Sequence, residues 1–167
     1  RIEAGSYALE RELVQVHQCV IRAFEAVERK ARKKGIQLIN EVSPEFVLGA
    51  DISAMEQVLV NLVENAVKYG REGGHVWVRL ERGSDAVRIE IVDDGPGISP
   101  QHRERLFERF YRVDTGRSRA EGGTGLGLAI VKHLVNAMGL EIGIRAREPH
   151  GCIFSIESQK IEITVAS

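Results

Sequence analysis

The chain has 167 residues, 43% of them hydrophobic, which is enough for one domain with a substantial core and excludes wholesale disorder. Its 23 Lys and Arg residues are balanced by 24 Asp and Glu residues, so it lacks the basic excess of a nucleic-acid-binding domain. No apolar run reaches the length of about 18 residues that spans a bilayer, and the isolated Cys19 and Cys152 fit buried thiols in a reducing compartment. We therefore expect a single cytoplasmic domain.

The predicted elements are those of a mixed helix and strand protein. Apolar residues at three- and four-residue spacing indicate helices, and alternating polar and apolar residues indicate strands. In chain order the sequence predicts a strand (residues 12–16), a helix (17–34), two strands (36–42 and 47–49), a helix (53–69), an antiparallel hairpin (75–82 with 85–92), a short helix from residue 100, a longer helix ending near residue 138, and strands over 140–147, 151–158 and 161–165. This order predicts an α/β fold, a two-layer sandwich in which a mixed, mostly antiparallel sheet has its helices on one face.

Capping signals indicate the ends of the second long helix. Ser53 and Glu56 match a capping box, in which Ser53 is the N-cap and the Glu56 side chain reaches back to it. Gly70 is a natural helix terminator. The sequence therefore predicts a helix that runs from Ser53 to Tyr69.

A polar stripe follows one side of this helix and includes Asn61, Asn65 and Lys68. On its pattern alone, such a stripe is usually a solvated helix face. Two asparagines four residues apart are nevertheless unusual in the middle of a helix, because Asn is a mediocre helix former. A carboxamide oxygen is a hard, neutral ligand suited to Mg²⁺, and a lysine one turn later is placed for a phosphate. The stripe is therefore either a solvated face or part of a magnesium and phosphate site.

A second pattern follows the strand over residues 85–92, where the sequence reads Asp93-Asp94-Gly95-Pro96-Gly97-Ile98. A carboxylate held at a buried strand end can accept a hydrogen bond from an exocyclic amine. The two spaced glycines let the backbone pass close to a flat ring. The alternative is an ordinary Asp-Gly-Pro turn.

A third pattern, Gly122-Gly-Thr-Gly-Leu-Gly-Leu128, leads into an apolar helix. Alternate glycines before a helix expose backbone N–H groups that can bind phosphate, helped by the helix N-terminus. No Gly-Lys-Ser/Thr follows, which excludes a Walker A loop, and no hydrophobic strand leads in, which excludes a dinucleotide-binding fingerprint. The alternative is a solvated mobile loop. Four arginines just upstream could meet a polyphosphate, namely Arg109, Arg112, Arg117 and Arg119.

In combination these motifs are more specific than any one of them. In chain order they are Asn61-x-x-x-Asn65-x-x-Lys68-Tyr69, Asp93-x-Gly95-x-Gly97, Leu106-Phe-Glu-Arg-Phe-Tyr-Arg112 and Gly123-Thr-Gly-Leu-Gly-Leu-Ala-Ile-Val-Lys132. This set resembles the N, G1, F and G2 boxes of the ATP-binding catalytic domain of sensor histidine kinases, over about residues 11–158. The resemblance implies the Bergerat ATP-binding fold. Residues 1–10 look like the end of a preceding dimerisation helix and its linker, and residues 11–167 like the catalytic domain.

The resemblance implies a role for each matching residue. Asp93 would bind the adenine amine, Asn65 would hold Mg²⁺ on the triphosphate, and Asn61 is a second candidate ligand for the metal. Lys68, Tyr69 and Arg112 would contact phosphates or ribose, and residues 123–127 would wrap the β- and γ-phosphates next to a mobile lid over residues 113–123. The implied catalytic residues are Asn61, Asn65, Lys68 and Arg112. The implied ATP-binding residues are these four with Tyr69, Asp93, Gly95, Gly97, Ile98, Phe110, Tyr111, Gly123, Thr124, Gly125, Leu126, Gly127 and Leu128.

By the same resemblance, we expect the catalytic domain of a two-component sensor histidine kinase, with ATP and Mg²⁺ as cofactors. It would donate the γ-phosphoryl group to a histidine on a dimerisation domain that this sequence lacks, and it would not phosphorylate itself. Its expected partners are that dimerisation domain and a downstream response regulator, without nucleic acid or membrane contact. The parent protein would be a sensor kinase, a class of protein that can be anchored in the cell membrane.

Two departures and two alternatives accompany this expectation. None of the five histidines is followed by Glu or Asp as in a phosphoacceptor motif, so all five are expected to be structural or surface residues. The family usually has Gly-Ser/Thr-x-Phe in the last part of the domain, whereas this chain has Gly151-Cys152-Ile153-Phe154, so a hydroxyl near the adenine is missing. A rival within the same fold is a serine kinase of the anti-sigma type, which acts on a protein hydroxyl. A rival from another class is a nucleotide-sensing module that binds ATP without turning it over.

Overall fold

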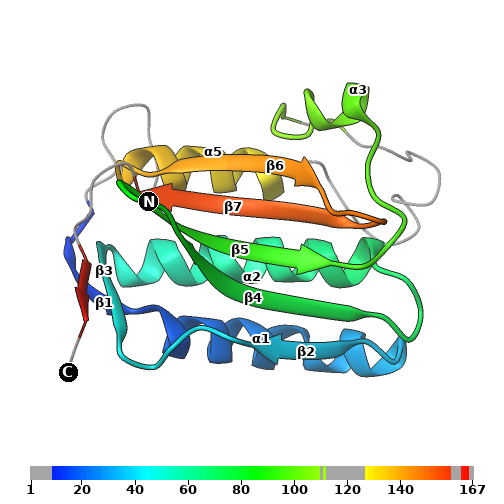
Figure 1. Cartoon of the computed structure of the whole chain (residues 1–167), viewed down its shortest axis with the longest axis horizontal. Coiled ribbons are helices and arrows are strands. Elements are labelled where there is room, and N and C mark those ends of the chain that lie inside the picture. Colours follow the sequence, from blue (N-terminus) through cyan, green and yellow to red (C-terminus); the bar gives the residue numbers. More distant parts are fainter. Residues whose placement is uncertain (1–8, 110, 112–126, 159–162, 166–167) are drawn as a thin grey trace.

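The computed structural model describes residues 9–109, 111, 127–158 and 163–165. Figure 1 shows its elements, which in chain order are β1 (Glu12–Gln15), α1 (Val16–Lys33), β2 (Gln37–Asn40), β3 (Phe46–Ala50), α2 (Ile52–Tyr69), β4 (His75–Arg82), β5 (Val87–Asp93), α3 (Pro100–Arg103), α5 (Gly127–Ala137), β6 (Glu141–Ala146), β7 (Cys152–Ser158) and β8 (Ile163–Val165). Each predicted helix and strand is present. Within the described part of the chain, no helix has the length and apolarity needed to cross a membrane.

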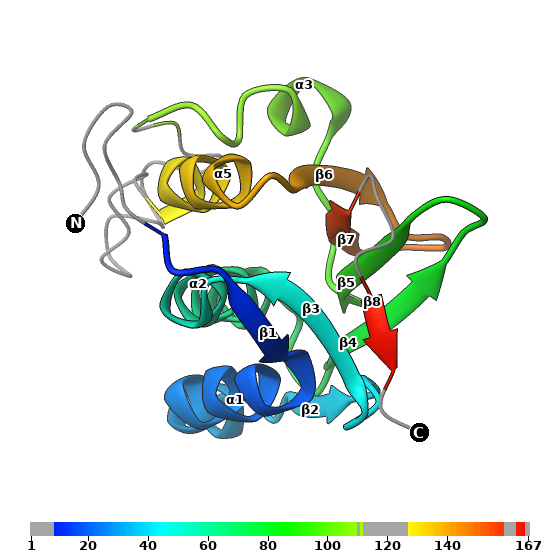
Figure 2. The same ribbon diagram turned by 90° about the vertical axis from the view of Figure 1, so that its left-hand side faces the viewer.

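The larger of two sheets has five strands in the order β2-β4-β5-β7-β6. β2 pairs with β4 in parallel, and the other neighbours are antiparallel. Helices α1, α2 and α5 stack beside one another on one face of this sheet, as Figure 2 shows. The predicted two-layer sandwich, with a mixed and mostly antiparallel sheet, is therefore confirmed.

A second, smaller sheet was not indicated by the sequence. β1, β3 and β8 pair antiparallel in the order β1-β3-β8, at the left-hand end of Figure 1. The break between β2 and β3 is a turn closed by the Phe46 N–H, which donates to the Ser43 carbonyl oxygen at 3.1 Å. This turn takes β3 out of the larger sheet, and the final strand pairs with β3 instead of extending that sheet.

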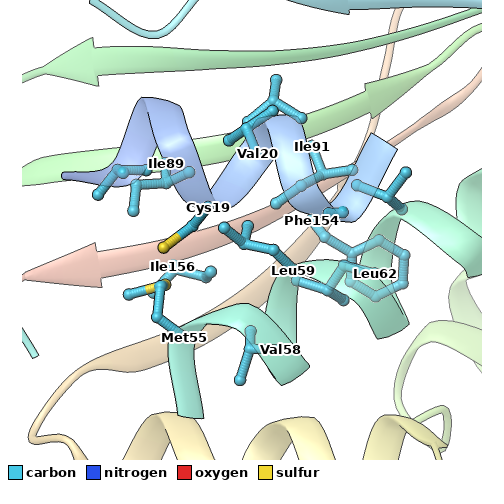
Figure 3. Close-up of a cluster of buried hydrophobic side chains, with 14 of the residues drawn as sticks. Cys19, Val20, Met55, Val58, Leu59, Leu62, Ile89, Ile91, Phe154 and Ile156 are labelled. Carbon is cyan, nitrogen blue, oxygen red and sulfur yellow. The ribbon is translucent and has the colours of Figure 1, made fainter. Parts of the chain in front are cut away.

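The core lies between the helices and the larger sheet. Side chains alternate along β5, so that Ile89 and Ile91 face the helices and are paired with Ile156 and Phe154 of β7. Figure 3 shows the helix side chains that meet them, which are Cys19 and Val20 of α1 and Met55, Val58, Leu59 and Leu62 of α2. Cys19 and Cys152 are both free and buried, as the sequence predicted.

The opposite face of the larger sheet carries a buried charge. Glu90 in the central strand β5 is 0% exposed. Its carboxylate lies 3.1 Å from Arg79, 3.4 Å from Arg88 and 2.9 Å from Arg145. Burial would raise the pKa of Glu90, but hydrogen bonds and charges from Arg145 and Arg79 hold it below its usual value. Arginine side chains therefore cover the middle of the face that has no helices.

Asp51 is the N-cap residue of α2. Its Oδ1 accepts the backbone N–H of Ala54 at 2.9 Å, which satisfies one of the N–H groups that lack a partner at a helix start. Its Oδ2 accepts the N–H of Glu10 at 2.8 Å. One carboxylate thus caps the helix and ties it to the segment before β1.

The predicted capping box at Ser53 and Glu56 is therefore wrong. β3 ends at Ala50, so the chain enters the helix earlier than the motif suggests, and Ser53 lies inside the first turn. Glu56 does not reach back to the helix start, because its carboxylate forms an ion pair with Arg22 of α1.

Asp51→Ala should lower the free energy of unfolding by about 1–2 kcal/mol, because it removes the N-cap and leaves a buried N–H without its acceptor. Ser53→Ala is the matched control and should change stability by less than about 0.5 kcal/mol. Urea unfolding of the two variants measures both values. Equal losses would contradict the assignment of the cap to Asp51.

Candidate functional site

The predicted site residues in the loop after β5 and at the end of α2 lie at one end of the larger sheet. There β5 and β6 end, β4 and β7 begin and α2 reaches its C-terminus, on the right-hand side of Figure 1. The loop after β5 lies directly on the end of α2. A Cβ atom on Gly95 would be 2.9 Å from the carbonyl oxygen of Tyr69 and 3.1 Å from the Cα of Gly70. The structure therefore brings two of the predicted motifs together.

Asp93 is the carboxylate at this end of β5. It is 7% exposed, and its Oδ1 accepts the N–H of Gly95 at 2.9 Å. Burial raises the pKa of this carboxyl to about 6, the charge of Asp94 adds to the rise, and the N–H of Gly95 and the charge of Arg147 oppose it. Acids with pKa values raised in this way are enriched at functional sites.

Asp94, the next residue, is engaged by the protein itself. Its Oδ1 accepts the N–H of His75 at 2.8 Å, and its Oδ2 lies 2.8 Å from Nδ1 of the same histidine and 3.5 Å from Arg71. Burial alone would raise the pKa of Asp94, but these contacts hold it below its usual value. The two adjacent aspartates thus have opposite environments: Asp94 fastens the start of β4, and Asp93 faces the site.

The polar stripe of α2 runs towards this loop. Asn61, Asn65, Lys68 and Tyr69 are half-buried, and the Lys68 ammonium lies 5.3 Å from the Tyr69 ring centroid. Neither asparagine side chain has a hydrogen-bonding partner among the described residues. Such carboxamide oxygens fit a hard divalent ion such as Mg²⁺.

Helix α1 holds α2 at two points that the sequence did not indicate. Lys30 forms an ion pair with Glu64 of α2 at 2.9 Å. The ammonium of Lys34 binds carbonyl oxygens at the end of α2, namely those of Val67 at 2.9 Å, Lys68 at 2.8 Å and Gly70 at 3.0 Å. Because these carbonyl groups lack helical partners, Lys34 satisfies them and positions the helix end under Gly95.

The aromatic segment after α3 packs against the sheet. Phe107 meets Phe154 of β7 edge to face, with ring centroids 6.1 Å apart. The hydroxyl of Tyr111 is hydrogen-bonded to His102, and the guanidinium of Arg105 lies 4.3 Å from the Tyr111 ring centroid. The sequence-predicted Tyr111 is therefore held by neighbours of its own segment.

The remaining predicted residues fall into two groups. Ile98 and Leu128 pack on the core, and Gly127 begins α5. Those that lie outside the described residues, with the predicted lid over residues 113–123, are Phe110, Arg112, Gly123, Thr124, Gly125 and Leu126. The phosphate-binding loop therefore stays a prediction.

Cys152 lies opposite Asp93 in the pairing of β5 and β7. Burial, together with the charge of Asp93, raises the pKa of the Cys152 thiol to about 12. The thiol therefore remains protonated at neutral pH and brings no charge to the site. It stands where the motif comparison expects a hydroxyl.

A family comparison agrees with these motifs. Residues 50–162 match the family described as histidine kinase-, DNA gyrase B- and HSP90-like ATPase, and this range includes the polar stripe of α2 and the Asp93 loop. The chain belongs to this family. Its relatives and structural neighbours are sensor histidine kinases, so the predicted resemblance is confirmed.

Three comparisons define the relationship. The sensory/regulatory protein RpfC of Xanthomonas campestris pv. campestris is 38% identical over 164 residues, which are 93% of this chain and 22% of RpfC. The mycobacterial sensor histidine kinase MprB has a TM-score of 0.76 at 33% identity, covering 90% of this chain and 98% of the MprB structure. Full-length ShkA in complex with AMPPNP has a TM-score of 0.79 at 32% identity, covering 97% of this chain and 33% of ShkA. This histidine-kinase-like ATPase domain thus spans about a fifth of RpfC.

Lys34→Met should lower the free energy of unfolding by about 1–3 kcal/mol, because methionine keeps the aliphatic stem but leaves the carbonyls at the end of α2 without their donor. Lys33→Met removes the same charge from the exposed neighbouring residue and should change stability by less than about 0.5 kcal/mol. Chemical denaturation compares the two. Similar stabilities would show that Lys34 does not hold the end of α2.

The raised pKa of Asp93 predicts that this residue lowers stability at neutral pH. Because the folded state holds the proton more tightly, the contribution of Asp93 to stability falls as the pH rises from about 4 to about 6. Asp93→Asn should therefore be more stable than the wild type above pH 6, by up to about 3 kcal/mol, with no difference near pH 4.

Asp94→Asn is the contrast for this measurement. The contacts of Asp94 lower its pKa, so this carboxylate stabilises the fold at neutral pH, and its loss should be destabilising there. Urea unfolding of the wild type and both variants between pH 4 and 8 measures the two differences. A destabilised Asp93→Asn variant at pH 8 would contradict the cost assigned to the buried charge.

Proposed function

We propose that this domain binds Mg-ATP and donates the γ-phosphoryl group to a histidine on the dimerisation domain of the same kinase. The observation that carries the proposal is the pair of aspartates with opposite environments. Asp94 is bound by His75, whereas Asp93 is buried with a raised pKa beside the end of α2. An ordinary Asp-Gly-Pro turn does not require a buried acid with a raised pKa. The family and the AMPPNP complex of ShkA support the assignment.

Adenine recognition is assigned to the loop after β5. The ionised carboxylate of Asp93 accepts a hydrogen bond from the exocyclic amine of adenine, so the ionised form is the one that binds. Gly95 and Gly97 have no side chains to cover the ring. Ile98 adds apolar surface. These residues form the proposed adenine site.

The triphosphate is assigned to the polar stripe of α2 and the glycine-rich loop. Asn65 is the proposed Mg²⁺ ligand and Asn61 the second candidate, because their carboxamides are half-buried and make no hydrogen bond to the described residues. The ion would neutralise phosphate charge. The other proposed contacts to phosphate or ribose are Lys68, Tyr69, Phe110, Tyr111, Arg112 and the backbone of residues 123–128.

Phosphoryl transfer requires of the protein mainly positioning and charge neutralisation. A ring nitrogen of the acceptor histidine forms a bond to the γ-phosphorus while the bond from that phosphorus to the bridging oxygen breaks, and ADP leaves with the oxygen. Lys68 would stabilise negative charge on the transferring group. The base that takes the proton of the histidine would belong to the dimerisation domain.

The proposal extends to the organisation of the parent kinase. Residues 1–10 would be the end of the dimerisation helix and its linker, and residues 11–167 the catalytic domain. The dimerisation domain would be the direct partner and a response regulator the downstream one. The domain would act in the cytoplasm, within a parent that can be anchored in the cell membrane.

Asp93→Asn should weaken binding of Mg²⁺ with a non-hydrolysable ATP analogue by about 10- to 100-fold at pH 7.5, because a hydrogen bond to a charged acceptor contributes about 1.5–3 kcal/mol. Isothermal titration calorimetry measures the affinity. Asp94→Asn removes the same charge from a residue that His75 already binds, and should have a smaller effect. Unchanged affinity in a folded Asp93→Asn variant would overturn the adenine assignment.

The same proposal predicts transfer of label from γ-labelled ATP to the kinase's own dimerisation domain, added as a separate protein. We expect acid-labile, base-stable label that forms slowly, because separate chains lack the roughly millimolar effective concentration of tethered domains. Asn65→Ala should abolish it. Acid-stable label on a serine would instead indicate the serine kinase, and binding without transfer the nucleotide sensor. Label on the histidines of this chain would contradict the proposal.

A further inference from the structure

The hairpin between β6 and β7, residues 147–151, lies against the loop that carries Asp93 (Figure 1). Gly151 has no space for a side chain, because a Cβ atom there would overlap the carbonyl oxygen of Asp93. The Nδ1 of His150 lies 3.2 Å from the carbonyl oxygen of Gly95. A carbonyl oxygen only accepts, so the histidine ring donates this hydrogen bond. The hairpin thus contacts the backbone of Asp93 and of Gly95, two residues further along the loop.

Arg147 forms two hydrogen bonds within this hairpin. Its backbone N–H donates to the carbonyl oxygen of Gly151 at 3.1 Å, and its Nη1 donates to the carbonyl oxygen of His150 at 2.9 Å. The guanidinium carbon lies 5.2 Å from the ring centroid of Trp77 in β4. The side chain therefore extends from the end of β6 towards β4, past the end of β5, where its charge lowers the pKa of Asp93.

We propose that Arg147 is a positioning residue for adenine recognition, which holds the β6–β7 hairpin on the Asp93 loop and supplies the positive charge that favours an ionised acceptor there. The inference rests on the proposed function, because it takes Asp93 as the group that binds the adenine amine. Arg147 itself touches no part of the nucleotide in this proposal. Its guanidinium hydrogen bond goes to His150, whereas the Asp93 carboxyl is hydrogen-bonded by the backbone N–H groups of Gly95 and Cys152.

Several other ionisable groups face Asp93 or its neighbours. Asp94 on β5 raises the pKa of Asp93, although contacts with His75 and Arg71 balance part of its charge. Cys152 on β7 is a neutral thiol. Other ionisable groups at this end of the sheet include Lys68 and Tyr69 of α2, Arg103 of α3, and Glu148 and His150 of the hairpin. Of all these, Arg147 is the group whose positive charge lowers the pKa of Asp93.

The alternative is a purely structural role on the outer face of the sheet. Arg147 covers Trp77, whose ring also stacks on His75 with centroids 5.3 Å apart, so a substitution could act by loosening this stack. A structural defect would weaken nucleotide binding equally at all pH values. Loss of a charge that favours ionised Asp93 would instead weaken binding most where Asp93 begins to be protonated.

The test is calorimetry of Mg²⁺ with a non-hydrolysable ATP analogue between pH 6 and 8. Arg147→Gln keeps a hydrogen-bond donor and loses the charge. It should bind about threefold more weakly at pH 6.5 and almost as tightly as the wild type at pH 8, since a nearby opposite charge typically shifts an acid by about one pKa unit and Asp93 starts from a pKa of about 6. Arg147→Lys keeps the charge and should restore most of the affinity. Arg145→Gln removes a charge that pairs with Glu90 at 2.9 Å, and should bind like the wild type.

The effect must also depend on Asp93. In an Asp93→Asn background, Arg147→Gln should leave the pH profile of binding unchanged. An equal loss at every pH, or the same pH-dependent loss in that background, would overturn the inference. If Arg147→Gln does not fold, Arg147→Met, which keeps the aliphatic packing on Trp77, takes its place.

The same experiment separates this inference from the proposed function. A wild type that does not bind the analogue, or whose binding is unaffected by Asp93→Asn, would overturn the proposed function and the inference with it. A wild type that binds through Asp93 but is insensitive to the charge at Arg147 would overturn the inference alone.

Discussion

At the end of β5 the backbone of Asp93 lies against Gly151, with no space for a side chain between them. On its other side the loop lies on the end of α2, where a Cβ atom on Gly95 would be 2.9 Å from the carbonyl oxygen of Tyr69. Gly97, with a φ of 84°, then turns the chain away in a conformation that other residues rarely adopt. Because the loop is held between a hairpin and a helix end, the carboxylate is in position before a ligand arrives. Such preorganisation reduces the ordering cost of binding.

Helix α2 supplies the other half of the proposed site and fixes its distance from the first. Its apolar side is buried in the core, so the polar stripe cannot rotate away from the site. Asp51 holds its start and Lys34 its end. The α2 residues proposed for metal and phosphate therefore belong to a rigid helix whose last turn packs against the Asp93 loop. A change at either end of α2 is expected to reach both halves of the site.

The sequence predicted what depends on local pattern. Helix and strand periods, the glycines around Asp93 and the layering of the fold follow from neighbouring residues, and the structure confirms them. Prediction from the sequence failed where contacts between distant parts of the chain determine the local structure. Ser53 fits a capping motif, but the end of β3 places the helix start at Asp51. Lys34 is one of several basic residues in a row, and only the position of the end of α2, more than thirty residues later in the chain, singles it out.

Two carboxylates on β5, three residues apart, show why the site needs an acid that is hard to ionise. Glu90 is buried under Arg79, Arg88 and Arg145, and the hydrogen bonds and charges of Arg145 and Arg79 hold its pKa below its usual value. A carboxylate so fully paired has little to gain from a ligand, because every new hydrogen bond would replace an existing one.

Asp93 is buried with far fewer partners, and its pKa rises to about 6. In that environment a donated hydrogen bond does not merely replace one from water, so the proposed hydrogen bond from an adenine amine would contribute more there than at an exposed acid. The charge of Arg147 favours the ionised form of Asp93, while its guanidinium donates a hydrogen bond to the carbonyl oxygen of His150. The same incomplete pairing that lowers the stability of the domain is therefore what leaves its carboxylate able to recognise a ligand.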